Sequence, residues 1–241
     1  MLVAKLYRGI QTQFQFPALH QPSTVGSHIN TFTTMIKLEK ILVLIFLVAL
    51  IMKITMIPVG GILTVISLSL LAIIYYPFGF ALFNSIGFRK ILKKDSYKSI
   101  SALRIIGAIG AGTALSIICV GVLFKIQHWP GSEMNLIAGL ITSLIILCIT
   151  IYKYYKAKGE YYIRIIKRII IASIFGLFMV LLTDLSLVKI QFRNHPEYIK
   201  AYELYINSPQ DEGLRRNLEI EYNRATMSKE EFEIYLQNSD K

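Results

Sequence analysis

The sequence predicts an all-α integral membrane protein with five transmembrane helices, arranged as two parallel-repeat hairpins plus one further span, and a soluble C-terminal helical tail. Three observations lead to this fold class. First, 54% of the 241 residues are hydrophobic and only 17% are charged, whereas a soluble domain carries about 25% charge. Second, the apolar residues form long blocks instead of following a helix or strand period. Third, the links between the blocks are either strongly basic or turn around a proline.

Five apolar blocks are long enough to cross a bilayer, whose core of about 30 Å takes about 20 helical residues. Cys119 and Cys148 lie inside two of them and are interpreted as small buried hydrophobic residues, without the spacing of a disulfide or a metal site. Because so many blocks cannot all form the core of a chain this short, they exclude an ordinary soluble enzyme. We predict the spans at residues 38–57, 62–83, 102–126, 134–152 and 165–188.

Residues 1–34 are polar and are predicted to be a disordered N-terminal extension. An alternative is that the natural chain starts at Met35, which would place a compact basic flank directly before the first span. The rest of the chain then divides into a first transmembrane hairpin, a basic cytoplasmic link, a second hairpin, a basic link with the fifth span, and a helical tail. These parts are residues 35–88, 89–101, 102–152, 153–190 and 191–241.

The basic residues predict how the chain is oriented. The links after the second and fourth spans, taken with the first residues of the spans that follow them (84–104 and 153–168), hold 12 Lys or Arg residues and 2 Asp or Glu residues. The positive-inside rule places both links and the N-terminus in the cytoplasm and the tail in the periplasm of a bacterial inner membrane. Most of the net charge of +11 is therefore an orientation signal that faces anionic lipid headgroups, so we expect no nucleic-acid partner.

The pattern Lys-Ile-x-x-x-Pro occurs twice, at residues 53–58 and 125–130. Pro58 and Pro130 cannot continue a helix, and Gly131, like the two glycines after Pro58, permits the chain to reverse. Together with Trp129 these residues form the predicted turn motif. Both hairpins then run in the same direction, as in a parallel internal repeat.

Small residues recur at spacings of three and four along the third span, a pattern that lets helices approach closely. The predicted helix-packing residues are Gly107, Ala111, Gly112 and Gly121. This face is expected to pack either between the hairpins or between subunits, and the sequence does not separate the two.

The tail is predicted to form soluble helices at 196–207 and about 210–225. A capping box of Ser228 and Glu231 predicts the start of a third helix. Tyr198, Tyr202 and Tyr205 form one stripe. The stripe is expected to pack on the tail's own helices, and a surface for a periplasmic partner is the alternative.

Ionisable groups at membrane depth are the candidates for function, because they are costly there. Lys125 and His128 share one helical face and are proton-relay or gating candidates together with Asp184, and Lys53 is the repeat equivalent of Lys125. The alternative is that both lysines extend to the interface while Trp129 anchors there. Asp184 is expected to pair with Lys53 or Lys125, or more simply with the nearby Lys189.

No motif for soluble enzyme chemistry is present in the sequence, and no Cys and His cluster has metal-ligand spacing. We therefore expect no catalytic residues, no metal and no cofactor.

The stretch Gly-Val-Leu-Phe-Lys-Ile-Gln-His-Trp-Pro-Gly at residues 121–131 resembles the first span and turn of the gliding-motility protein GldL, and the resemblance covers about residues 103–152. It implies a two-span hairpin in which Lys125 and His128 match the family's polar pair. In that family the hairpin forms an inner-membrane ring around GldM, thought to be a proton-driven motor for gliding and type 9 secretion. The family's proton-carrying glutamate has no counterpart in the predicted span 134–152, and Glu133 lies at its mouth.

Two functions are favoured over a small transporter, for which polar residues at mid-span are lacking, and over a membrane-embedded enzyme. The first is a non-enzymatic membrane assembly or scaffold component with a periplasmic interaction tail. The second is a proton-coupled motor or conducting subunit related to gliding motility and type 9 secretion. The expected partners are membrane lipids, other membrane-protein subunits or a second copy of the chain, and a periplasmic protein bound through residues 191–241.

Overall fold

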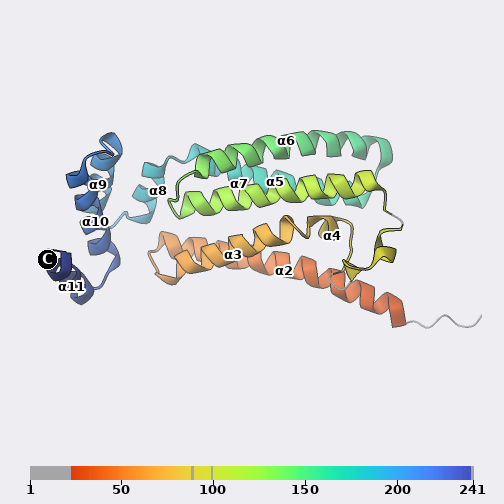
Figure 1. Ribbon diagram of the computed structural model, residues 1–241, viewed down its shortest axis with the longest axis horizontal. Helices are drawn as coiled ribbons and strands as arrows, with labels where there is room; N and C mark the ends of the chain where they lie inside the picture. Colours follow the sequence, from red (N-terminus) through yellow and green to blue (C-terminus); the bar gives the residue numbers. More distant parts are fainter. Residues whose placement is uncertain (1–22, 88–89, 99, 240–241) are drawn as a thin grey trace, which may run out of the picture.

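The computed structural model describes residues 23–87, 90–98 and 100–239, and every regular element within them is a helix (Figure 1). The longest helices lie in the first three quarters of the chain, interrupted by the short α4 and η2, and shorter helices follow. Their bounds are α2 Ser23–Ile54, α3 Val59–Tyr75, α4 Gly79–Phe83, η2 Lys94–Tyr97, α5 Ala102–Ile126, α6 Ser132–Ala157, α7 Glu160–Leu181, α8 Asp184–Gln191, α9 Pro196–Asn207, α10 Glu212–Thr226 and α11 Lys229–Ser239.

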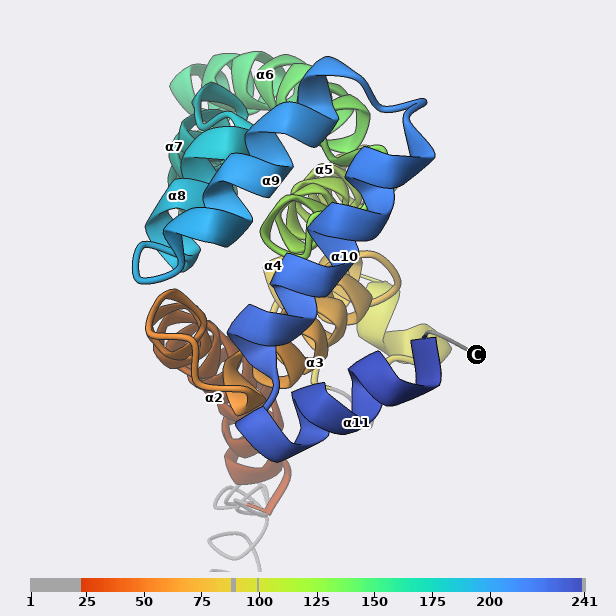
Figure 2. The ribbon, with the colours of Figure 1, turned by 90° about the vertical axis from the view of Figure 1, so that its left-hand side faces the viewer.

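The long helices form one elongated bundle. Helices α2 and α3 pair as one antiparallel hairpin, α5 and α6 pair as a second, and α7 packs on α5 and α6. We call the end that carries residues 55–58 and 127–131 the turn end, and the opposite end, with residues 90–98 and 158–159, the basic end. Helices α9 and α10 lie across the turn end (Figure 2).

Two helices, α5 and α6, are long and apolar enough to cross a membrane by themselves. The bent pair of α7 and α8 makes a third candidate if it is taken as one span. Helix α3 is apolar but has only 17 residues, and the described side chains of α2 include Lys37, Glu39 and Lys40 near one end. The apolar helices point to a membrane protein, while the count of five spans stays a prediction.

The predicted continuous fifth span at 165–188 is wrong. Helix α7 ends at Leu181 and α8 begins at Asp184, and the two helices meet at 92°. Between them Thr183 caps α8, with its Oγ1 accepting a hydrogen bond from the backbone N–H of Ser186 at 3.1 Å. A local side-chain bond of this kind competes with helix continuation, so an apolar run alone does not ensure an unbroken helix.

The predicted second span at 62–83 is also broken. Helix α3 ends at Tyr75 and the short helix α4 begins at Gly79, with Pro77 between them. Proline has no N–H to donate and its ring clashes with the preceding turn, which accounts for the break. The third span has the predicted bounds, and α6 extends past the predicted 134–152 at both ends.

The helix α2 begins at Ser23, so residues 23–34 are helical where the sequence predicts disorder. Residues 1–22 lie outside the described residues. Met35, the alternative start, is buried with 1% of its surface exposed.

The small residues of α5 pack within the chain. A Cβ built at Gly112 would lie 2.3 Å from the backbone oxygen of Tyr75, so α5 and α3 approach each other backbone to backbone. A Cβ at Gly121 would lie 2.8 Å from the backbone nitrogen of Leu136, which brings α6 equally close on another side. Ala111 is fully buried. The Gly112 contact lies between the hairpins and the Gly121 contact within the second one, so these residues pack inside the chain and not between subunits.

Two residues of the spans are less enclosed than the sequence suggests. A Cβ at Gly107 would meet nothing closer than the Tyr161 hydroxyl at 3.5 Å, so this glycine is not required by a close approach. Cys119 is buried as predicted, but Cys148 is exposed on the surface of α6, and its predicted burial is wrong.

The tail forms as the sequence predicts. Helix α9 has the predicted bounds, and the Ser228–Glu231 capping box is present: Ser228 N donates to Glu231 Oε2 at 2.9 Å and Glu231 N donates to Ser228 Oγ at 3.3 Å. Tyr198 is buried, with its ring centroid 4.3 Å from that of Phe192 and 5.7 Å from that of Tyr222. Tyr198 therefore packs on the tail's own helices.

Candidate functional site

The two hairpin turns have the same backbone geometry. Three residues after each motif lysine the chain enters the left-handed region, with φ 59° at Met56 and φ 57° at His128. In both turns that residue donates its N–H to the carbonyl of the lysine, at 3.1 Å to Lys53 and 3.3 Å to Lys125. A positive φ is uncommon for residues other than glycine, so the shared geometry is a specific feature of the motif.

The glycines act differently from the prediction in one of the two turns. Gly131 has φ 84° and directly precedes α6, as expected of a reversal point. Gly60 lies inside α3, where a Cβ would be 2.6 Å from the backbone nitrogen of Lys53. In the first turn Met56 therefore makes the reversal, Pro58 caps α3, and Gly60 allows the two helices to meet closely.

Lys125 is the most enclosed charged residue among those described, with no exposed surface. Its Nζ lies 2.8 Å from Oδ1 of Asp184 at the start of α8 and 3.5 Å from Oε1 of Glu133 in the first turn of α6. Those two carboxylate side chains are 49% and 67% exposed. Lys125 thus does not extend into the interface, and Asp184 pairs with it rather than with Lys189.

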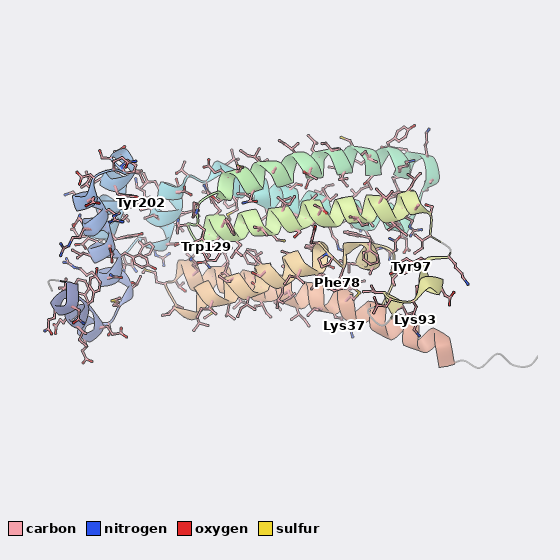
Figure 3. The ribbon with its side chains drawn as sticks, viewed as in Figure 1. Lys37, Phe78, Lys93, Tyr97, Trp129 and Tyr202 are labelled. Carbon is pink, nitrogen blue, oxygen red and sulfur yellow. The ribbon has the colours of Figure 1, made fainter. Side chains whose placement is uncertain are left out.

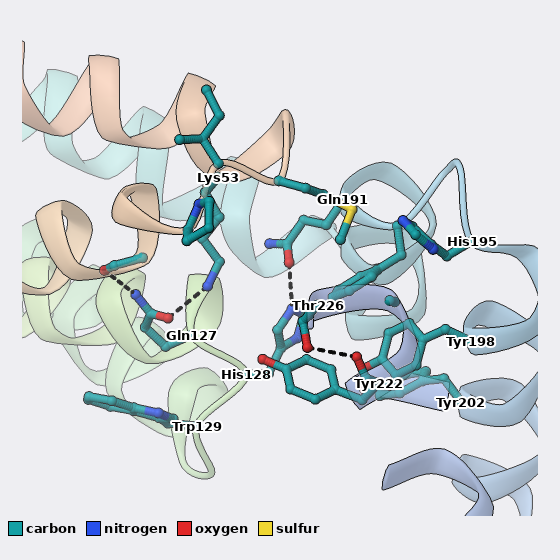
Figure 4. A pocket seen from close by; sticks show the side chains of 16 residues that line it. Lys53, Gln127, His128, Trp129, Gln191, His195, Tyr198, Tyr202, Tyr222 and Thr226 are labelled. Carbon is teal, nitrogen blue, oxygen red and sulfur yellow. Dashed lines mark hydrogen bonds between the residues drawn. The ribbon is translucent and has the colours of Figure 1, made fainter. Parts of the chain in front are cut away.

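Lys53 makes a different contact from its repeat equivalent. Its Nζ donates to Oε1 of Gln127 at 2.7 Å, and the Gln127 amide donates to the Gly61 carbonyl at 2.9 Å (Figure 4). The Gln127 side chain therefore bridges the two hairpin turns, and the structure does not bring Lys53 to Asp184.

His128 and Lys125 follow each other at one helix end but bond to different groups. His128 Nε2 lies 3.2 Å from Oε1 of Gln191, the last residue of α8. Burial lowers the pKa of this imidazole below its usual 6.5, the Gln191 contact opposes that shift, and Lys53 and Lys125 add to it. His128 is therefore held in its neutral form near neutral pH.

Trp129 lies at the turn end, as Figure 3 shows, with 44% of its surface exposed. Its ring packs edge-on against Phe124 with centroids 5.4 Å apart. Half burial next to the exposed Pro130 is typical of an aromatic residue at a membrane–water interface.

Two cavities adjoin one another at the turn end, with volumes of about 620 and 560 Å³. Both are lined by His128, Trp129 and Tyr202. The larger continues towards Lys53 and the tail helices, while the smaller contains Glu133 and Asp184. The predicted candidates thus gather at one end of the bundle: Lys53, His128 and Asp184 line the two cavities, and Lys125 is buried beneath them without lining either.

A second buried charge cluster, at the basic end, was not predicted. Glu39 is 6% exposed, and its two carboxylate oxygens accept from Nε and Nη2 of Arg168 on α7 at 2.6 Å each. The Tyr75 hydroxyl donates to the same carboxylate at 2.8 Å. The sequence does contain a signal for this cluster, because Glu39 lies on the same face of α2 as the buried Leu42 and Phe46. The signal was missed because Glu39 stands among lysines that were interpreted as a basic flank of the first span.

The described residues include no group of three or more His, Cys, Asp or Glu side chains that could hold a metal ion.

A family model described as the GldL N-terminal domain matches residues 108–163. The matched segment includes most of α5, the second turn with Lys125 and His128, all of α6 and the start of α7. The first hairpin, α8 with Asp184, and the tail lie outside it. No curated protein and no solved structure matches the chain at a significant level. The match agrees with the GldL resemblance found in the sequence, and with the apolar helices it points to a membrane protein that contains a GldL-like segment.

Proposed function

We propose that the chain is a non-enzymatic scaffold component of a membrane assembly related to gliding motility or type 9 secretion, built around a GldL-like hairpin. In this proposal it crosses a bacterial inner membrane five times, as a duplicated hairpin plus one span. Its basic links face the cytoplasm and its tail binds a periplasmic protein, while lipids and other membrane-protein subunits, or a second copy, contact the spans. The GldL N-terminal domain match over 108–163 supports a role in this kind of membrane assembly.

One observation carries the choice of a scaffold. Lys125 is completely buried, and its ammonium ends on Asp184, which belongs to α8 outside the matched hairpin. In this proposal the charge of the buried lysine serves structure, because its ion pair with Asp184 holds α8 and the tail against the second turn. A proton carrier would need a group that changes its protonation without breaking such a contact.

The alternative, a proton-coupled motor or conducting subunit, draws on the same family match and on the neutral His128. Its difficulty lies in α6, the counterpart of the family's second span. Glu133 in the first turn is the one carboxylate of that helix, and its side chain is 67% exposed at the turn end.

Co-purification tests the scaffold proposal. A tagged chain is isolated from its native membrane in a mild detergent, and its partners and their stoichiometry are identified. We expect a fixed set of membrane and periplasmic partners, part of which is lost when Leu204 and Ile206, exposed apolar residues of α9, are both changed to Glu. Lys200→Glu, an exposed change on the same helix, serves as the control. Recovery of the chain alone would contradict the proposal.

Two further measurements separate the alternatives. A His128→Ala variant that keeps its partners but abolishes motility or proton flux would favour the motor. For orientation, an impermeant maleimide is expected to label Ser208→Cys in the exposed tail from the periplasm and to leave Lys98→Cys of the basic link unlabelled. The reverse labelling pattern would overturn the proposed topology.

A further inference from the structure

The larger cavity at the turn end is built from three separate parts of the chain. Its walls come from the first turn, the second turn and the helices α8, α9 and α10 (Figure 4). Met56 of the first turn packs with Phe192 and Tyr198 of the tail, so the cavity closes only when tail and hairpins are assembled. At about 620 Å³ it falls within the range of small-molecule sites.

The charge in this cavity is one-sided. Lys53 reaches into it with its ammonium on the neutral oxygen of Gln127, and none of the described residues that line the cavity is an Asp or Glu. The carboxylates of the neighbouring space, Asp184 and Glu133, already share Lys125. A half-buried ammonium without a negative partner is a site at which an anion gains free energy.

The rest of the lining suits a group with both polar and apolar parts. Tyr202 and Tyr222 offer hydroxyl groups and ring faces, while Ile57 and Met56 offer aliphatic surface. The cavity lies where the apolar helix α5 ends and Trp129 is half exposed, the depth at which lipid headgroups meet a membrane protein.

We infer that this cavity binds a phosphate ester, with Lys53 as its counter-charge, and that the bound group is the headgroup of an anionic phospholipid. This site is distinct from the scaffold contacts proposed above and goes beyond them. A water-soluble phosphate ester has the same anionic chemistry, so the test includes it as a separate arm.

Trp129 provides the readout, because it is the single tryptophan of the chain and lines the cavity. The full chain in detergent is titrated with short-chain phosphatidylglycerol, short-chain phosphatidylcholine, glycerol phosphate and inorganic phosphate while its fluorescence is recorded. We expect a saturable change with phosphatidylglycerol and binding of phosphatidylcholine that is weaker by at least about tenfold, or about 1.4 kcal/mol.

Variants of Lys53 assign the site. Lys53→Gln is expected to weaken phosphatidylglycerol binding by at least about tenfold, since it removes the counter-charge, and Lys53→Arg is expected to keep most of the affinity. Lys189→Gln, an exposed lysine on α8 that does not line the cavity, is the matched control and should bind like the unchanged protein. Native mass spectrometry of the unchanged protein from mixed-lipid nanodiscs adds a count of retained phosphatidylglycerol that does not depend on how any variant folds.

The results of these titrations distinguish a lipid headgroup from a soluble phosphate and from the absence of an anion site. If glycerol phosphate or inorganic phosphate binds as tightly as phosphatidylglycerol, the cavity binds an anion but its ligand is a water-soluble phosphate, which overturns the lipid assignment. Equal affinity for phosphatidylcholine, unchanged binding by a folded Lys53→Gln variant, or no retained phosphatidylglycerol in the mass spectra would overturn the inference altogether.

Discussion

The two ends of the bundle each hold a buried ion pair, but the pairs are built differently. At the basic end the guanidinium of Arg168 forks onto both oxygens of Glu39, with side chains that are only 19% and 8% exposed. At the turn end Lys125 is completely buried, whereas Asp184 keeps 49% of its side chain exposed. In the first pair both side chains are mostly buried, whereas in the second pair only the lysine is buried.

The two pairs join different helices, and they differ in how much stability the protein should lose when the acid of the pair is removed. Arg168 attaches α7 to the first hairpin through α2, and Asp184 attaches α8 to the second hairpin through α5. Water reaches the carboxylates at the turn end, and Glu133 lies near Lys125 as a second acceptor. Among the described residues Arg168 has one carboxylate partner, Glu39, so the basic end should tolerate the loss of its acid far less well.

Glu39→Gln gives the largest expected effect. It leaves the Arg168 guanidinium mostly buried without its counter-charge, and we expect a loss of about 3–5 kcal/mol in the free energy of unfolding, measured by denaturant or thermal unfolding in detergent. The control is Asp95→Asn, whose pair with Lys98 is exposed on both sides, 77% and 83%, and should cost less than about 1 kcal/mol. Equal costs for the two variants would remove the contrast between the ends.

Gly112→Ala tests the close contact between the hairpins, which neither ion pair reaches. The new Cβ would lie 2.3 Å from the Tyr75 backbone oxygen, and backbone cannot rotate away as a side chain does. We expect a loss of about 1–3 kcal/mol in the same unfolding measurement. Gly107→Ala on the same helix, with its nearest neighbour at 3.5 Å, should cost nothing. Unchanged stability of Gly112→Ala would mean that α3 and α5 can move apart enough to admit the new methyl group without loss.

Asp184→Asn should be milder than Glu39→Gln, at about 1 kcal/mol, because Glu133 remains near the buried ammonium of Lys125. The informative variant is the double change with Glu133→Gln. It leaves Lys125 buried without any carboxylate, so its cost should exceed the sum of the two single costs. Simple additivity in a double-mutant cycle would show that the two acids do not substitute for each other.

The smallest expected effect is the pH dependence at the turn end. Burial lowers the pKa of His128 in the folded state, so below about pH 6.5 the unfolded chain binds a proton that the folded chain does not. Unfolding stability should therefore fall as the pH is lowered through this region. Comparing melting temperatures at pH 7.5 and 5.5 for the unchanged protein and His128→Gln checks this, and an equal drop in both would assign the effect to other groups.

Local sequence signals predicted local structure well. The bounds of α5 and α9 and the capping box of Ser228 and Glu231 follow from residues that are neighbours in the chain, such as the proline at the start of α9. The bend at Thr183 was missed because a single capping hydroxyl inside an apolar run outweighs the hydropathy around it. The partner of Asp184 was left open among three lysines, because residues 59 positions apart are brought together only by the packing of α8 on the second turn.

The sequence by itself determined the apolar helices, the two Lys-Ile-x-x-x-Pro turns, the GldL-like hairpin and the set of ionisable residues at the turn end. These properties depend on composition and short spacings, which a single chain displays without folding. The tertiary structure alone decided that Lys125 meets Asp184 while Lys53 meets Gln127, that Glu39 is buried against Arg168, and that the tail closes a cavity over the turns. Each of these contacts joins segments far apart in the chain, which only the packing of the helices brings within bonding distance.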